Sequence, residues 1–138
     1  MTRKGPSKPV DKTHGNRRLD IARAFLKAAQ NEATLADEAS IGNPIASQVV
    51  NAAIAYADAI TAARLGRINQ QDHEGVQKLL RDALGERLPE VQARRLRRIL
   101  SAKDTAQYGA RLLRKDDAVR LLDDAEEFAR WAEAELVR

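Results

Sequence analysis

From Arg17 onward, apolar side chains recur at steps of three and four residues, the period of an α-helix with one buried face. No segment alternates polar and apolar residues as a half-buried strand would, and the chain contains no repeat of fixed period. The pattern predicts an all-α fold, an antiparallel up-and-down helical bundle of about five helices. The predicted helices cover residues 17–39, 44–65, 72–84, 89–101 and 116–137.

Residues that start and stop helices separate these segments. Gly42 is suited to ending the first helix, and Pro44 to the first position of the second. Asp72 is a predicted N-cap, because its carboxylate can accept from the free amides of the first turn. Gly85 is expected to close the third helix. The segment 44–65 is apolar over so much of its circumference that we expect it to be the central helix.

The length of 138 residues suits one compact domain. Residues 1–16 contain two prolines, two glycines and hardly an apolar side chain, so we expect a flexible basic tail there. His14 lies in that tail and is therefore not expected to be a ligand or a catalyst. The single helical domain is expected over residues 17–138.

Composition removes most enzyme classes. The chain has no cysteine and only two histidines, so no disulfide framework, thiolate nucleophile or recognisable transition-metal site is expected. Glycine-rich phosphate loops and the common hydrolase and metalloprotease motifs are absent from the sequence. We expect no metal and no cofactor. No apolar run approaches the ~20 residues of a membrane span, and we expect a cytoplasmic protein with no membrane partner.

The net charge of +4 is unevenly distributed. Residues 64–115 carry 13 positive and 6 negative side chains, a net of +7, whereas residues 116–138 carry a net of −5. The positive segment includes an arginine cluster that would suit a phosphate backbone. The alternative is that these arginines pair with acidic residues of the last helix. The cluster consists of Arg94, Arg95, Arg97 and Arg98.

The connection between the second and third predicted helices carries the candidate catalytic residues. Arg67 precedes His73 by six positions, and polar residues, including Asn69 and Asp72, lie between them. With Asp72 as N-cap, His73 falls in the first helical turn, where free amides and the helix dipole favour an anion such as phosphate. An arginine can bind phosphate in a bidentate way, and histidine can transfer protons near neutral pH. An exposed histidine with no such role is the alternative.

Two further features remain open from the sequence. Asp58 lies on the otherwise apolar second helix, where it could orient a catalytic group, pair with an arginine or face solvent. Phe128 and Trp131 lie beside the main apolar stripe of the last helix. Such aromatic residues could anchor an interface or cover the end of the monomer core.

The C-terminal part of the chain resembles HEPN domains (higher eukaryotes and prokaryotes nucleotide-binding), which are small all-α bundles. The resemblance covers residues 45–138 and lies in the alanine-rich helix Asn51–Leu65, the stretch Leu96–Tyr108, Asp117-Ala118 and Ala125–Phe128. Many HEPN proteins have an arginine followed four to six residues later by a histidine, a spacing that Arg67 and His73 match. The pattern differs at Ile68, where a polar residue is usual, and at Gly75, where members modified by an antitoxin carry tyrosine.

The resemblance implies a metal-independent ribonuclease of the kind that is often the toxin half of a toxin-antitoxin pair. In such a protein Arg67 handles the scissile phosphate of an RNA substrate and His73 assists proton transfer, with Asn69 and Asp72 as supporting groups. The implied partners are a second copy of the chain, because the family forms composite sites in homodimers, and a nucleotidyltransferase-type antitoxin. The alternatives are a catalytically silent HEPN-like module that binds nucleotide or nucleic acid, and a protein-interaction module.

Overall fold

The structure is a computed structural model that describes residues 6–70 and 72–138, with His73 described for its backbone only. It confirms the predicted all-α bundle. The five principal helices correspond to the five predicted segments, and a one-turn helix, α5, follows α4. The helices are α1 (Lys12–Leu35), α2 (Asn43–Leu65), α3 (His73–Leu84), α4 (Glu90–Ser101), α5 (Lys103–Gln107) and α6 (Lys115–Leu136), and a 3₁₀ turn, η1, spans Gly85–Arg87.

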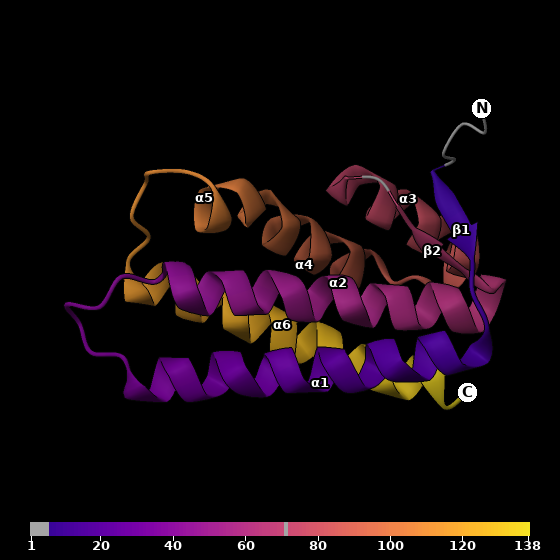
Figure 1. Ribbon diagram of the computed structural model, residues 1–138, viewed down its shortest axis with the longest axis horizontal. Coiled ribbons are helices and arrows are strands. Elements are labelled where there is room, and N and C mark those ends of the chain that lie inside the picture. The colour runs from indigo at the N-terminus through magenta and orange to yellow at the C-terminus, as the bar shows by residue number, and fades with distance from the viewer. Residues whose placement is uncertain (1–5, 71) are drawn as a thin grey trace.

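Helix α2 is the central element, as predicted. Figure 1 shows α1 lying antiparallel along one side of α2, α6 behind it, and α3 to α5 forming a shorter layer on the other side. Fourteen of the 23 residues of α2 are buried, which only a helix covered on several sides can achieve. Many of these are alanines, so the neighbouring helices can approach closely.

The core is drawn from the predicted stripes of several helices. Ile60, Leu80, Leu122 and Phe128 are all buried in it. Leu79 belongs to the apolar period of α3 but is only half-buried, whereas its neighbour Leu80 is fully buried.

The prediction of a flexible tail is wrong for residues 6–16. Ser7–Pro9 form a strand, β1, that pairs antiparallel with β2, Arg67–Asn69, although the sequence pattern predicted no strand. Helix α1 then begins at Lys12 instead of Arg17, capped by Asp11, which accepts from the His14 backbone amide at 2.9 Å. Composition did not predict the strand β1, because this strand forms through main-chain hydrogen bonds to a segment about 60 residues away.

Two glycines allow turns that the helices need. Gly66 ends α2 in the left-handed region at φ 65°, which favours glycine. Gly42 approaches the α5–α6 loop so closely that a Cβ atom there would lie 2.5 Å from the Arg114 carbonyl oxygen. The Gly42 amide donates to the Leu113 carbonyl at 2.7 Å. These contacts join the α1–α2 and α5–α6 loops at one end of the bundle.

Candidate functional site

The segment from β2 to the start of α3, called the β2–α3 connection below, carries the predicted catalytic residues. Its first part, β2, pairs with the N-terminal strand β1. Arg67 pairs with Pro9 in the ladder, and Asn69 pairs with Ser7. The Gln70 amide donates to the Pro6 carbonyl at 2.9 Å. The connection is therefore an ordered segment as far as Gln70.

The side chain of Arg67 reaches across the ladder to Ser7. Its Nε donates to Ser7 Oγ at 2.8 Å, and one Nη donates to the Ser7 carbonyl at 2.9 Å. The other Nη has no hydrogen-bond partner among the described residues. The guanidinium therefore fastens β1 to β2, and one of its Nη atoms makes no bond to the described residues.

Asn69 and Asp72 organise the turn that follows. Asn69 Nδ2 donates to the Asp72 carbonyl at 3.1 Å, and Asp72 Oδ1 accepts from the Gly75 amide at 3.3 Å. The second bond confirms the predicted N-cap. His73 is the first residue of α3, but its side chain lies outside the described residues. That Arg67 and His73 share a site stays a prediction.

A small pocket of about 110 Å³ lies beside this connection, and it brings in a residue that the sequence did not single out. Its lining includes Ser7 and Asn69 from the strands and Lys78 and Asp82 from α3. Lys78 is exposed and adds a cation near the turn. Nothing in the sequence marks Lys78, which is one of many charged residues on polar helix faces.

The α4 arginines divide between the two predicted roles. Arg98 donates to both oxygens of Asp124 on α6 at 2.9 and 2.8 Å, as the ion-pair alternative predicts. Arg94 and Arg97 are exposed, and neither side chain has an acidic partner in the described part of the chain. Arg95 is half-buried and contributes to lowering the pKa of Glu127, after the larger effect of Arg130.

Asp58 pairs with an arginine, one of the three predicted alternatives. Arg18 on α1 donates through Nε to Asp58 Oδ2 at 3.1 Å. Burial raises the pKa of Asp58 to about 6, although the nearby Arg18 lowers it. The pair links α1 to α2 inside the bundle.

A second network links α1, α2 and α6. Arg23 holds both carboxylate oxygens of Glu133 at 2.8 and 2.7 Å, and the Tyr56 hydroxyl donates to Glu133 Oε2 at 3.1 Å. The Arg23 bonds keep the pKa of Glu133 below its usual value. Burial, with the Glu133 charge beside it, raises the pKa of Tyr56 to about 12.

The sequence did not mark Glu135 as buried, yet it is the most buried carboxylate among the described residues. Glu135 near the end of α6 is 1% exposed, and three arginines surround it. Arg87 of η1 lies 2.5 Å from Glu135 Oε1, Arg64 Nε lies 3.5 Å from the same oxygen, and Arg138 lies 3.4 Å from Oε2. Arg64 also donates to the Glu135 carbonyl. Only the fold brings Arg64 of α2 and Arg87 of η1 to Glu135, whereas Arg138 lies three residues further along the chain.

The aromatic pair on α6 lies at the monomer core. Phe128 is fully buried, and its ring centroid is 5.5 Å from that of the half-buried Trp131. This fits the interpretation that the pair covers the core, and it leaves Trp131 as the more accessible of the two. The homodimer itself stays a prediction.

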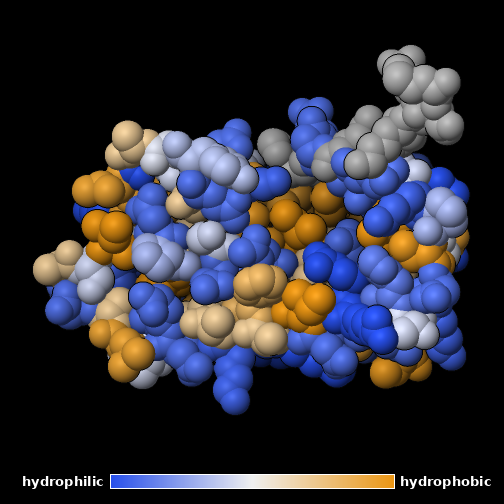
Figure 2. Space-filling model, in the orientation of Figure 1, coloured by the Kyte–Doolittle hydropathy of each residue, from blue (hydrophilic) through white to orange (hydrophobic). Residues whose placement is uncertain are grey.

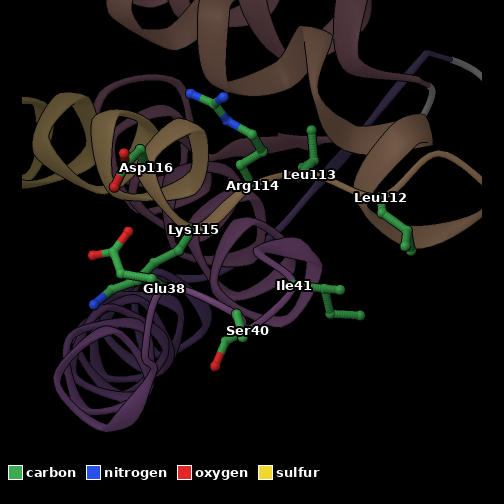
Figure 3. Close-up of a pocket in the computed structure, with 9 residues that line it drawn as sticks. Glu38, Ser40, Ile41, Leu112, Leu113, Arg114, Lys115 and Asp116 are labelled. Carbon is green, nitrogen blue, oxygen red and sulfur yellow. The ribbon is translucent and has the colours of Figure 1, made fainter.

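Several exposed apolar side chains lie at the end of the bundle that holds the α1–α2 and α5–α6 loops, on the left of Figure 2. A pocket of about 390 Å³ lies at this end. Figure 3 shows Ile41, Leu112 and charged residues at the start of α6 among its lining residues. Lys115 Nζ is already bonded to the Ala36 carbonyl at 2.9 Å, so this cation serves to close the loops. The large exposed apolar residues here are Leu35, Ile41, Tyr108 and Leu112.

Among residues 6–70 and 72–138, no cluster of three or more histidine and acidic side chains is arranged to hold a metal ion. No helix in the same range is both long and apolar enough to cross a membrane. Comparison with protein-family models finds no match to this chain, and a search of curated proteins also finds none.

Proposed function

We propose that this chain is a HEPN-like RNA-binding module that contacts the phosphate backbone through α4. The observation that carries the proposal is the pair Arg94 and Arg97, which are exposed, one helical turn apart and without an acidic partner among the described residues. Unpaired arginines at this spacing can contact neighbouring phosphates. Residues 64–115, which contain α4, also carry the net charge of +7.

Fluorescence anisotropy with a labelled single-stranded RNA tests this proposal. Changing Arg94→Gln and Arg97→Gln together should weaken binding and reduce the slope of log K against log salt by about 1.4, because two phosphate contacts are lost. The matched control is Arg17→Gln with Lys27→Gln, two exposed cations on α1, which lies on the other side of α2 from α4 (Figure 1). Equal losses in both double variants would contradict a specific α4 surface, and so would an absence of RNA binding by the unmodified protein.

The second candidate function is metal-independent RNA cleavage. It is favoured by strand β2, which carries Arg67 and Asn69, and by the bond from Asn69 to Asp72 just before α3 begins at His73. In this mechanism His73 transfers the proton to or from the attacking 2′-hydroxyl and the leaving oxygen, while Arg67 stabilises charge on the phosphate. The free Nη edge of Arg67 is the part available for that contact.

Incubating RNA with the purified protein in EDTA separates the two functions. Cleavage that yields cyclic phosphate ends, and that falls at least ~100-fold in His73→Ala, would support the enzyme. Arg67→Ala also removes the bonds to Ser7, so Ser7→Ala is the control that loosens the strand and keeps the guanidinium. RNA binding without cleavage would leave the binding module alone.

The partners implied by the resemblance belong to this proposal. A homodimer would unite two β2–α3 connections, and the enzyme would be restrained by a nucleotidyltransferase-type antitoxin. Sedimentation equilibrium at micromolar concentration tests the first of these. A monomer of 15.3 kDa at all concentrations would remove the composite site.

A further inference from the structure

A pocket of about 620 Å³ opens between α1 and α6, above the C-terminal half of α2. Small residues make its floor, because α2 places Ala59, Ala62 and Ala63 there and α1 places Gly15. Helices α1 and α6 each pack more closely on α2 than on one another. No large side chain therefore fills the space between them at this end.

The walls of the pocket are aliphatic. Leu19 comes from α1, and Leu136 and Val137 come from the end of α6. Val137 is 86% exposed, so a bound ligand would cover apolar surface that now faces water. No aromatic side chain is among the described residues of the lining, which argues against a nucleobase, since bases bind by stacking on aromatic rings.

The charged groups at the pocket favour a single anionic group. Arg23 and Arg64 are held by Glu133 and Glu135. Lys12 is exposed and makes no ion pair with any residue that the structure describes. As the first residue of α1, it also lies at the positive end of the helix dipole. The free positive charge is therefore at the Lys12 end.

The pocket is also preformed. The bidentate Arg23–Glu133 pair and the Tyr56 bond to Glu133 fix α1, α2 and α6 relative to one another beside it. Pockets of this size with apolar walls and a few fixed polar groups are typical small-molecule sites. The ligand therefore needs an aliphatic body and one acidic end.

We infer that this pocket binds a linear aliphatic carboxylate, with its chain against Leu19 and Leu136 and its carboxylate at Lys12. The site is separate from the α4 arginines, so it stands or falls independently of RNA binding. The unpaired cation Lys12 is the first residue of α1, seven positions before Leu19 of the lining, and Leu136 comes from α6. This arrangement matches a ligand that is polar at one end only.

Isothermal titration calorimetry of the full chain with decanoate tests the inference. Saturable binding of one decanoate is expected, with amide chemical-shift changes at Gly15 and Val137 in NMR spectra. Ala63→Leu should reduce affinity at least roughly tenfold, because the exposed Ala63 lines the pocket and a larger side chain would fill it. The control is Ala24→Leu, an exposed alanine of α1 outside the pocket lining.

The charged end is tested with Lys12→Gln, which should weaken decanoate binding roughly tenfold through loss of a charge-assisted contact. Lys27→Gln, an exposed lysine of the same helix, should leave it unchanged. Decan-1-ol should bind more weakly than decanoate. No saturable binding of decanoate, equal affinity in Ala63→Leu, or equal affinity for decan-1-ol would each overturn the inference. Circular dichroism of every variant checks that it is folded.

Discussion

Three arginines on the α1 side of the central helix α2 fasten helices together, whereas two arginines on the α4 side end in solvent. Arg18, Arg23 and Arg64 each reach a carboxylate on another helix. Arg94 and Arg97 reach none within the part of the chain that the structure describes. The difference arises from what lies opposite each arginine, because acids of α2 and α6 lie near the first group and solvent surrounds the second. One residue type thus serves stability in one region and is free for binding in the other.

The largest effect is expected at Glu135, where one buried carboxylate serves three arginines. Glu135→Gln should lower the free energy of unfolding by about 2 to 4 kcal/mol, because it leaves Arg64 and Arg87 facing one another without the acid. The arginines are partly exposed, so the loss should fall short of that for a fully buried pair. Urea unfolding followed by circular dichroism measures it. Glu127→Gln, an exposed acid of the same helix, should give no measurable change.

A pH-dependent effect is expected at Asp58. Burial raises its folded pKa to about 6, above the ~3.9 of an unfolded aspartate, so the folded state holds more protons between these values. Stability should therefore fall as pH rises from about 4 to 6, by roughly 2 kcal/mol from this group. In Asp58→Asn that slope should disappear, as measured by urea unfolding across this range. Parallel profiles for the variant and the unmodified protein would refute the assignment, and Asp20→Asn provides the exposed control.

The contribution of Glu133 to stability should change with pH in the opposite direction to that of Asp58. Its folded pKa is lowered, chiefly by the hydrogen bond from Arg23, so its contribution is present above the unfolded pKa and is lost as pH falls through the folded one. Glu133→Gln should reduce stability at neutral pH and flatten the acid limb of the same urea profile. If Glu133→Gln and Asp58→Asn changed the profile in the same direction, the contrast between the two carboxylates would be wrong.

A small effect is expected for Arg98, the α4 arginine with a partner. Arg98→Gln should cost about 0.5 to 1 kcal/mol in urea unfolding, because the pair with Asp124 is bidentate but largely exposed. A cost of several kcal/mol would show that α4 is fastened to α6 as firmly as α1 is to α2.

The smallest effect on stability is expected for Arg94. Arg94→Gln should change the free energy of unfolding by less than about 0.5 kcal/mol, because its side chain has no partner to lose among the described residues. Its effect should appear in RNA affinity instead. A stability loss equal to that of Arg98→Gln would place Arg94 with the fastening arginines.

The candidate site was predictable only in part. The N-cap at Asp72 follows from local chemistry and was found, because an aspartate before an apolar period needs no distant partner. The engagement of Arg67 by Ser7 was not foreseeable, since it depends on a strand pairing between residues 60 positions apart. His14 was expected in a flexible tail but lies in α1, because this helix begins before its apolar stripe does.

The sequence by itself determined the helices and the central position of α2, because a period of three to four residues and an all-round apolar helix act through local geometry and burial. The tertiary structure decided which charged residues are neutralised. Glu135 pairs with arginines from α2, η1 and the C-terminus. Arg98 of α4 pairs with Asp124 of α6, whereas Arg94 faces solvent. Charge pairing acts over a few ångströms, and only the packed helices set which residues lie that close.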